Sequence, residues 1–141
     1  MPTRKATATW TGTLKEGKGH LKGQSGLDMQ YAFSSRFADG AGTTPEELLA
    51  AAHAGCYSMA LNAALEKNGF VAEFVSTEGQ CTIEKIGDGM VISKLKLVTR
   101  AKVPGLSAEK FYEFAEATKT GCIISQALSA VPMELEATLE A

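Results

Sequence analysis

The chain has 141 residues, the size of a single domain that can bury its own hydrophobic core. Its formal net charge is −2 and it contains no run of Lys and Arg, which argues against a nucleic-acid-binding surface. Hydrophobic residues make up 45 % of the chain and charged residues 21 %, an ordinary globular balance.

We expect the sequence to contain no segment for export or for crossing a membrane. The first residues, MPTRKATATW, lack the apolar core of a signal peptide. The longest apolar stretch is interrupted by His53 and bounded by charged residues, which argues against a transmembrane helix. Three widely spaced cysteines, Cys56, Cys81 and Cys122, do not suggest a disulfide scaffold. We therefore expect one cytoplasmic domain over residues 1–141, with no membrane partner.

The first third of the chain has the alternation of β-strands. Residues 6–14, ATATWTGTL, place threonines on one face, which predicts a half-buried strand. The glycines of EGKG at 16–19 predict a hairpin turn, after which HLKGQSG returns. MQYAFSS at 29–35 predicts a third strand, and the glycine-rich FADGAGTT that follows at 37–44 predicts a loop.

Residues 45–68 predict one long helix. Thr44 suits the N-cap, Pro45 suits the first helical position, and Glu47 follows Thr44 by three residues, as in a capping box. Gly69 is a typical C-terminal stop. A helix with so few polar side chains is buried on most sides. Because a chain of this size can hardly surround it, we expect a subunit interface to cover part of it.

The rest of the chain, from residue 73 onward, predicts two strands, two helices and a last strand. Residues 73–86 and 90–103 alternate in hydrophobicity on either side of the turn GDG. The predicted apolar faces contain Val75, Thr77, Gly79, Cys81 and Ile83 in the first strand and Val91, Leu95 and Leu97 in the second. Ser107 caps a helix over 108–119, CIISQALSA begins a short helix near Cys122, and MELEATLEA alternates as a final strand. This order predicts one α+β domain with antiparallel sheets.

Two thiols could carry chemistry, although a cysteine taken alone is more often an inert buried residue. Cys56 lies in the interior of the apolar helix, where burial raises the pKa of a thiol unless a cation is close. Cys122 follows a glycine and opens a helix, where backbone amides and the helix dipole favour a thiolate. Local electrostatics therefore rank Cys122 as the more reactive thiol.

Other polar residues could assist Cys56. Arg36, in FSSRF, is a candidate cation, although spacing alone does not place it beside Cys56. His53 is a nearer candidate base, although a lone histidine on an apolar helix face is more often structural. Glu46 has no role in the sequence beyond the helix dipole. Glu46 and Cys56 are about 15 Å apart along a helix axis, so they can share a site only through an antiparallel second helix in a two-fold dimer.

Four segments together resemble one known family: FSSRF, TTPEELLAAAHAGCYSMAL, VPGLSAEKF and KTGCIISQAL. They resemble the OsmC/Ohr family of osmotically inducible and organic-hydroperoxide-resistance proteins, and the wording AAHAGCYSMAL is closer to the OsmC branch. The resemblance covers nearly the whole chain. It implies an α+β fold that forms an intertwined homodimer, with antiparallel β-sheets packed around two long central helices and two sites at the subunit interface.

The resemblance also implies roles for individual residues. Cys56 would be the peroxidatic thiol and Cys122 the resolving thiol, the reverse of the ranking from local electrostatics. Arg36 would stabilise the Cys56 thiolate, and Glu46 would orient this arginine across the dimer. His53 matches no catalytic base of the family. The family usually has proline after the second cysteine, where this chain has Ile123.

The implied function is a thiol-dependent peroxidase that reduces organic hydroperoxides, and hydrogen peroxide less efficiently, in oxidative and osmotic stress defence. Cys56 would become a sulfenic acid and condense with Cys122 to a disulfide, which a dithiol reductant such as a lipoylated protein would reduce. Apolar residues such as Phe33, Phe37, Leu49 and Met59 would suit the organic part of the substrate. No cofactor, metal or nucleic acid is implied.

Three alternatives stay open. The protein could be a dimeric binding protein that uses the apolar interface groove without peroxidase turnover. It could use Cys56, His53 and Cys122 as a zinc site, although no CxxC or HxxxH pair is present. It could also be a redox sensor that uses the same two thiols.

Overall fold

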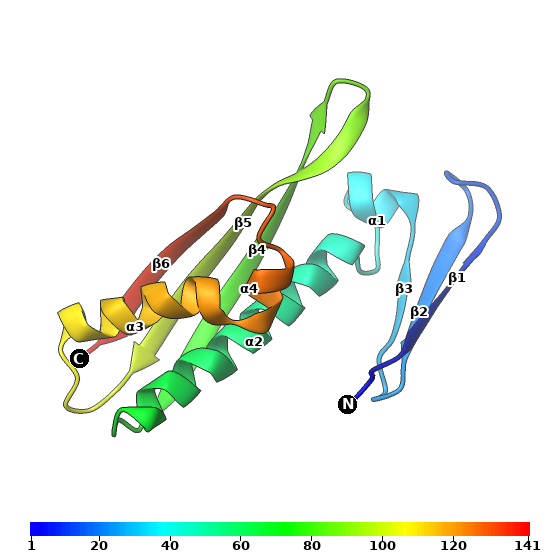
Figure 1. The fold of residues 1–141 in the computed structure, drawn as a ribbon. Coiled ribbons are helices and arrows are strands. Elements are labelled where there is room, and N and C mark those ends of the chain that lie inside the picture. Colours follow the sequence, from blue (N-terminus) through cyan, green and yellow to red (C-terminus); the bar gives the residue numbers. More distant parts are fainter. The chain divides into compact units, whose positions relative to one another are not determined.

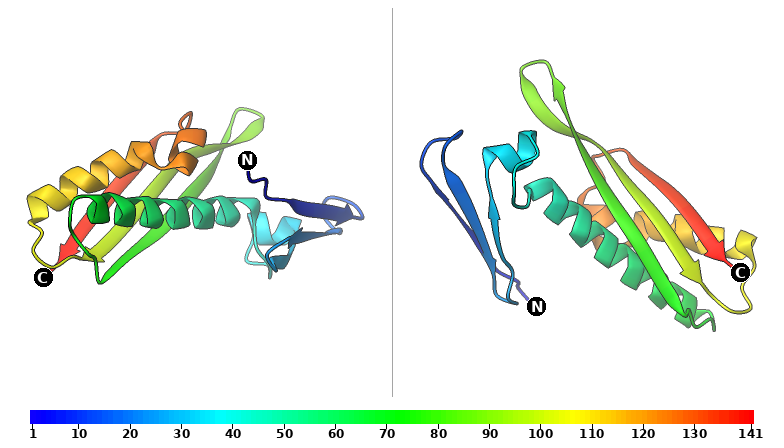
Figure 2. Two further views of the ribbon diagram at one scale, coloured as in Figure 1. Left: turned by 60° about the horizontal axis from the view of Figure 1, so that its bottom comes forward. Right: turned by 180° about the vertical axis from the view of Figure 1, so that it is seen from behind.

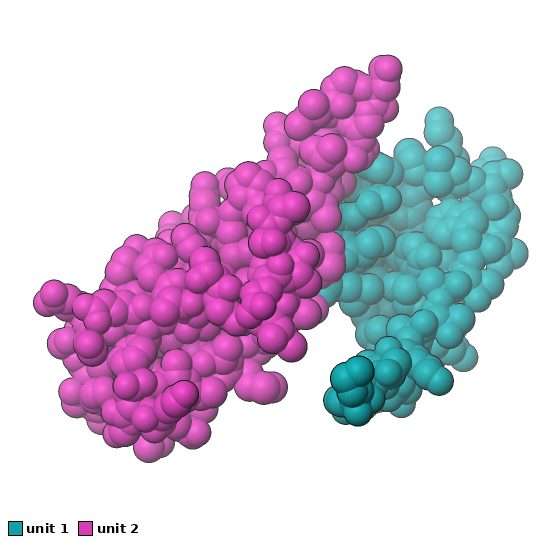
Figure 3. Space-filling view, viewed as in Figure 1, with its two compact units in different colours: residues 1–48 teal, residues 49–141 magenta.

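The computed structural model describes residues 1–141, which form two compact units. Unit 1 contains residues 1–48 and unit 2 contains residues 49–141 (Figure 3). Each unit has its own three-stranded sheet. Together the two sheets and four helices make the predicted α+β chain, while its organisation as one domain stays a prediction.

Unit 1 is an antiparallel meander, as the alternation of its sequence predicts. Strands β1 (Ala6–Thr11), β2 (Lys18–Gly23) and β3 (Asp28–Tyr31) pair in the order β1–β2–β3 (Figure 1). Gly12 turns the chain out of β1 with a φ of 95°, a backbone conformation that favours glycine. The rings of Trp10 and Tyr31 contact each other across the sheet, with centroids 5.6 Å apart.

The prediction of a strand over residues 29–35 is wrong after Tyr31. Residues Phe33–Phe37 form the short helix α1. The hydroxyl of Ser35 both accepts a hydrogen bond from the Ala32 amide and donates one to the Ala32 carbonyl, each at 2.8 Å. This local pairing of a serine side chain with the backbone replaces the strand ladder.

Helix α2 (Pro45–Lys67) confirms the predicted long helix and its ends. The Glu47 amide donates to the Thr44 hydroxyl at 3.0 Å, which makes Thr44 the N-cap. The Glu47 carboxylate accepts from the Thr43 hydroxyl, where a capping box predicts the Thr44 amide as donor. Gly69 ends the helix with a φ of 86°.

The sheet of unit 2 is mixed, so the prediction of antiparallel sheets is wrong for its last strand. Strands β4 (Phe74–Ile86) and β5 (Gly89–Lys102) form the predicted antiparallel hairpin. Strand β6 (Met133–Glu140) pairs with β5 in parallel. Helices α3 (Ala108–Gly121) and α4 (Ile123–Ala127) connect β5 to β6. A helical crossover returns the chain to the starting end of β5, and this makes the pairing parallel.

The predicted alternation also fails at the start of β5, because the register shifts by one residue. Thr82 pairs with Lys94 and Ile83 pairs with Ile92, which leaves Ser93 as an extra residue in β5. Such a bulge reverses the faces beyond it. Ile92 therefore lies opposite Ile83 on the partly buried face, and Val91 is exposed.

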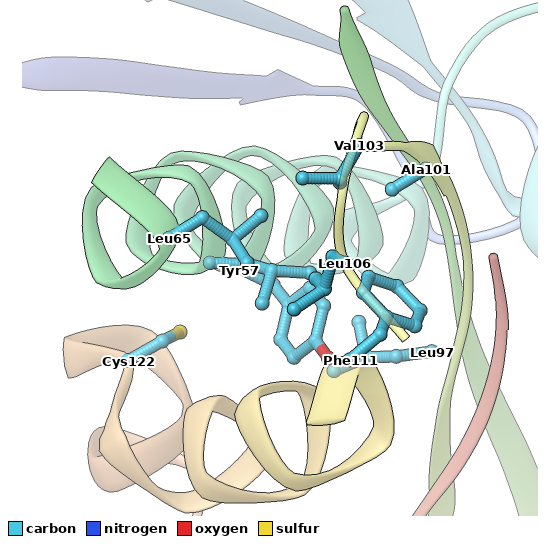
Figure 4. Packing of buried hydrophobic residues seen from close by; sticks show 9 residues of the cluster. Tyr57, Leu65, Leu97, Ala101, Val103, Leu106, Phe111 and Cys122 are labelled. Carbon is cyan, nitrogen blue, oxygen red and sulfur yellow. The ribbon is translucent and has the colours of Figure 1, made fainter. Parts of the chain in front are cut away.

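Helices α2 and α3 cover one face of the β4–β5–β6 sheet (Figure 2), and the core of unit 2 lies between them and the sheet. Figure 4 shows this core, whose buried members are Tyr57, Leu61, Leu65, Leu97, Ala101, Val103, Leu106, Phe111 and Cys122. The Tyr57 hydroxyl donates to the Ala115 carbonyl at 2.8 Å, so its buried polar atom is satisfied. Cys122 is thus the sulfur-bearing member of a packed core.

One side of α2 remains exposed in the single chain. Over residues 51–63, the exposed residues of this helix are small or apolar: Ala51, Ala52, Gly55, Met59 and Ala63. Only 22 % of the most apolar part of α2 is buried, and by length and composition the helix could cross a membrane, a property shared by core helices of soluble proteins. We call these five residues the small-residue stripe. The predicted subunit interface would require such a surface.

We expect Leu61→Ala to lower the free energy of unfolding by about 2–5 kcal/mol, because Leu61 is fully buried and its loss leaves a cavity. Urea unfolding followed by circular dichroism would measure this change. Val71→Ala is the matched control, since Val71 is 73 % exposed and should change the same quantity by less than about 0.5 kcal/mol. Equal losses in both variants would contradict this description of the core.

Candidate functional site

The four predicted site residues form two pairs, one in each unit. In unit 2, Cys56 of α2 and Cys122 at the start of α4 lie close enough for each thiol to shift the pKa of the other. In unit 1, Arg36 of α1 forms an ion pair with Glu46 at the start of α2. Each pair joins residues that the sequence singled out separately.

The two thiols come from different elements. The side chain of Cys122 points from the turn between α3 and α4 toward α2, as Figure 4 shows. Cys122 is 2 % exposed, whereas Cys56 is only partly buried. Both are thiols that no disulfide joins. Two neighbouring thiols from different elements are placed for thiol–disulfide chemistry.

Cys122 is the more acidic of the two, as local electrostatics predict. Burial by itself raises the pKa of Cys122, but hydrogen bonds from Ser125, from Cys56 and from the Ile124 amide lower it further than burial raises it. The Ser125 amide donates to the Cys122 sulfur at 3.3 Å. The pKa of Cys122 therefore lies below its ordinary value.

Cys56 has the opposite balance. Burial raises the pKa of Cys56, and the neighbouring Cys122 raises it further. The backbone amides of Ile124 and Ile123 donate to its sulfur and lower the pKa in part, but it stays above its ordinary value. Proline at position 123 would have no N–H to donate. The departure from the family pattern at Ile123 thus adds a hydrogen-bond donor to Cys56.

His53 is not placed to act as a base for Cys56, because its imidazole contacts Ser125 instead. Its Nε2 is 2.8 Å from the Ser125 Oγ, and the two residues are 1 % and 3 % exposed. Burial lowers the pKa of His53, so its imidazole is neutral near pH 7. The sequence prediction missed Ser125. Its position three residues after the N-cap Cys122, as in a capping box, could have revealed it.

Arg36 and Glu46 make a partly buried ion pair. The guanidinium donates from Nη2 to the Glu46 Oε1. Glu46 is 8 % exposed, while 43 % of the Arg36 side chain is exposed. Glu46 therefore anchors one edge of the guanidinium and leaves Arg36 accessible to a further anionic group.

An aromatic cavity in unit 1 adjoins this ion pair. It has a volume of about 460 Å³, and Arg36 is its only charged lining residue. The aromatic lining comes from Trp10, Tyr31, Phe33 and Phe37. Such a cavity can hold an apolar group whose polar end reaches a guanidinium.

The structure does not group the proposed zinc ligands. No three His, Cys, Asp or Glu side chains come together as a set that could hold a metal ion. The Nε2 of His53 contacts Ser125.

Comparison with known proteins identifies relatives over almost the whole chain. Residues 38–136 match the family model described as OsmC-like protein. The chain is 40 % identical over 129 residues to Peroxiredoxin OsmC of Escherichia coli (strain K12), and the match covers 90 % of each protein. The organic hydroperoxide resistance protein OhrB of Bacillus subtilis is similar in structure, with a TM-score of 0.72 and 26 % identity over 96 % of this chain and 98 % of that one. An OsmC-like protein of unknown function from Vibrio cholerae shares the fold, with a TM-score of 0.78 and 16 % identity over 97 % and 99 % of the two chains.

We expect the stability of the protein to fall in acid through His53. The unfolded chain protonates this histidine near its ordinary pKa of 6.5, whereas burial keeps the folded-state pKa lower. Below about pH 6.5 the unfolded state therefore binds more protons, and stability is lost as the pH falls toward the folded-state pKa. Urea unfolding at a series of pH values would show a smaller decline in His53→Gln than in the wild type. An identical decline in both proteins would contradict the burial of a neutral imidazole.

Proposed function

The chain belongs to the OsmC-like protein family, and we propose on this basis that it is a thiol peroxidase that reduces organic hydroperoxides and, less efficiently, hydrogen peroxide. The observation that carries the proposal is the proximity of the thiols of Cys56 and Cys122, which shift each other's pKa. The names of its relatives, Peroxiredoxin OsmC and the organic hydroperoxide resistance protein OhrB, support it. Its cellular role would be defence against oxidative and osmotic stress in the cytoplasm.

The first step uses Cys56 as the peroxidatic thiol. Its thiolate attacks the outer oxygen of the hydroperoxide, an S–O bond forms, and the O–O bond breaks. The sulfur is oxidised to a sulfenic acid, and the other oxygen leaves as an alcohol after it takes up a proton. The partial exposure of Cys56 suits this role, because the substrate must reach the sulfur.

In the second step Cys122 resolves the sulfenic acid. The Cys122 thiolate attacks the Cys56 sulfur, an S–S bond forms, and the hydroxyl leaves as water after it takes up a proton. The disulfide protects Cys56 from further oxidation. An external dithiol, such as a lipoylated protein, then reduces the disulfide and is itself oxidised.

Cys56 needs a cation to form its thiolate, because burial raises its pKa. Arg36 is the proposed cation, and Glu46 is proposed to orient it. Within one helix Glu46 and Cys56 are about 15 Å apart along the axis. We therefore place the Arg36–Glu46 pair of one subunit beside the Cys56 of the other, in an intertwined homodimer.

The small-residue stripe supports a second copy of the chain as the partner at this interface. Small side chains let two helix backbones approach closely, and a two-fold axis perpendicular to α2 would set the two α2 helices antiparallel. The exposed apolar residue Met59, 76 % exposed in the single chain, would become buried there. In this dimer the two α2 helices would be the central helices of the assembly, and each chain would act as one domain.

The aromatic cavity favours an organic substrate. An alkyl or aryl group would lie among Phe33, Phe37 and Trp10, with the peroxide oxygens toward Arg36. Arg36 can then stabilise the charge that develops on the leaving oxygen. Hydrogen peroxide has no apolar group for this cavity, and we expect it to react more slowly.

We expect Cys56→Ser to abolish turnover of cumene hydroperoxide with a dithiol reductant, because the attacking sulfur is lost. Cys122→Ser should still react once and accumulate a sulfenic acid, which dimedone labelling and mass spectrometry would detect. Cys81→Ser is the matched control, and we expect its activity to stay near that of the wild type. Unchanged background turnover in the wild type and both active-site variants would instead favour a dimeric binding protein.

We expect Gly55→Glu to dissociate the dimer and lower peroxidase activity by at least tenfold, since separate chains would lack the partner's Arg36. A side chain at Gly55 meets no atom within 4 Å in the single chain, so the fold should tolerate the change. Sedimentation velocity would measure the oligomeric state. Val71→Glu adds the same charge at an exposed position away from the stripe and should stay dimeric. A dimeric, active Gly55→Glu protein would rule out this interface.

A further inference from the structure

A chain of buried hydrogen bonds extends from Cys122 to a histidine that the peroxidase steps leave without a role. The Ser125 amide donates to the Cys122 sulfur at 3.3 Å, and the Ser125 side chain lies close enough to this sulfur to lower the pKa of Cys122. The same Ser125 hydroxyl is 2.8 Å from the Nε2 of His53. All three residues are at most 3 % exposed. These hydrogen bonds link α2 to α4 beside the two thiols.

The single proton of the serine hydroxyl determines which group donates and which accepts in these hydrogen bonds. A hydroxyl has one proton to donate and two lone pairs. If Ser125 donates that proton to a Cys122 thiolate, its oxygen must accept from His53, which is then the neutral tautomer with its proton on Nε2. If Cys122 is a thiol, the donor and acceptor roles can reverse, and Ser125 can donate to an Nε2 that carries no proton. The imidazole therefore adapts to either state of the sulfur without becoming charged.

We propose that His53 and Ser125 are positioning residues that hold Cys122 as a thiolate, so that it attacks the Cys56 sulfenic acid and later leaves readily when the disulfide is reduced. This proposal rests on the proposed peroxidase function for its kinetic consequences, but not for the state of the Cys122 sulfur. The burial of both residues supports it, because hydrogen bonds to a charged group are strong where water is excluded. The lowered pKa of Cys122 agrees with it.

The two halves of the cycle use the same thiolate. When the disulfide forms, Cys122 supplies the electron pair for the S–S bond, the S–O bond of the sulfenic acid breaks, and the hydroxyl leaves as water with one proton taken up from the solution. When the reductant attacks the Cys56 sulfur, the S–S bond breaks and its electron pair returns to Cys122. A thiol of lower pKa leaves faster in such an exchange. We therefore assign Cys56, the less buried sulfur, as the atom that the reductant attacks.

Few other titratable groups face Cys122. From α2 these are Cys56, in direct contact, and Tyr57, whose pKa burial raises. On α3, Glu116 raises the pKa of Tyr57 and pairs with Lys119. The charged residues of β5 and β6 form ion pairs with one another on the exposed face of the sheet: Lys94–Glu134, Lys96–Glu136 and Arg100–Glu140. Besides Cys56 and the local amides, the hydrogen bonds through Ser125 are thus the main polar interactions near the Cys122 sulfur.

The test is a thiolate titration of Cys122 in a Cys56→Ser, Cys81→Ser background, where Cys122 is the only cysteine. The ultraviolet absorbance of the thiolate, followed against pH, reports its ionisation without any enzyme activity. We expect Ser125→Ala to lower the ratio of thiolate to thiol at a given pH by about tenfold, because a hydrogen bond to a charged sulfur is lost. His53→Leu should cause a smaller loss in the same direction, since the Ser125 hydroxyl remains.

Conservative variants and a matched control separate this role from a merely structural one. Ser125→Thr keeps the hydroxyl and His53→Gln keeps an N–H donor, so each should restore most of the lost ionisation. Thr118→Val removes another hydroxyl, 6 % exposed, that bonds to the Phe114 carbonyl at 2.8 Å and should leave the titration unchanged. An unchanged titration in Ser125→Ala, or an equal shift in Thr118→Val, would overturn the proposal.

A second readout connects the thiolate to the reaction. In the protein with all three cysteines, one equivalent of cumene hydroperoxide would form the disulfide in a single turnover. We expect Ser125→Ala to slow this step by about tenfold below neutral pH and to shift its pH profile upward, with little change at high pH, where Cys122 ionises unaided. An unshifted profile beside a shifted titration would overturn the kinetic part. If no oxidation occurs in any variant, the proposed peroxidase fails, and the titration still decides the role of Ser125.

Discussion

A buried sulfur can carry charge only where hydrogen-bond donors replace the water that burial removes. This constraint governs the site in unit 2, because Cys122 is part of the hydrophobic core. Burial alone disfavours its thiolate, and donors from α4 and from Cys56 reverse that preference. Cys56 receives donors from the same turn but too few to overcome its burial. The first residues of α4 thus provide hydrogen-bond donors to both sulfurs, and the pKa values of the two thiols differ as a result.

In the proposed mechanism, the two units carry different halves of the chemistry. Unit 2 provides two thiols and the donors that distinguish them. Unit 1 provides the guanidinium of Arg36, held by the nearly buried carboxylate of Glu46, on the wall of an aromatic cavity. A thiol with a raised pKa needs such a cation to become a nucleophile at neutral pH. The proposed dimer is the arrangement in which the second chain supplies this cation.

The crossover between β5 and β6 is what places the donors. Helix α3 runs over the sheet, and α4 begins where Cys122 can face α2. The parallel pairing of β6 follows from this connection. Packing of Tyr57, Leu61 and Leu65 of α2 against the same core holds Cys56 opposite α4. The geometry of the thiol pair therefore depends on the packing of the whole of unit 2.

The sequence by itself determined the local features of this protein. The limits of α2 follow from Thr44, Pro45 and Gly69, and the more acidic thiol follows from the position of Cys122 at a helix start, because capping and backbone amides act over a few residues. The family motifs also indicate the four proposed site residues. Local patterns did not predict the helix at Phe33–Phe37, where the Ser35 hydroxyl hydrogen-bonds to the Ala32 backbone in place of strand pairing. They also did not predict the parallel pairing of β6.

Only the tertiary structure brought together residues that are distant along the chain. His53 and Ser125 are 72 residues apart, and neither has a sequence motif that names the other as its partner. Their contact arises because α4 packs on α2, a result of side-chain packing across the entire unit. Alternation and spacing report which face of an element is apolar, but they do not report which element will cover it. The partner of a buried polar group is decided by that packing.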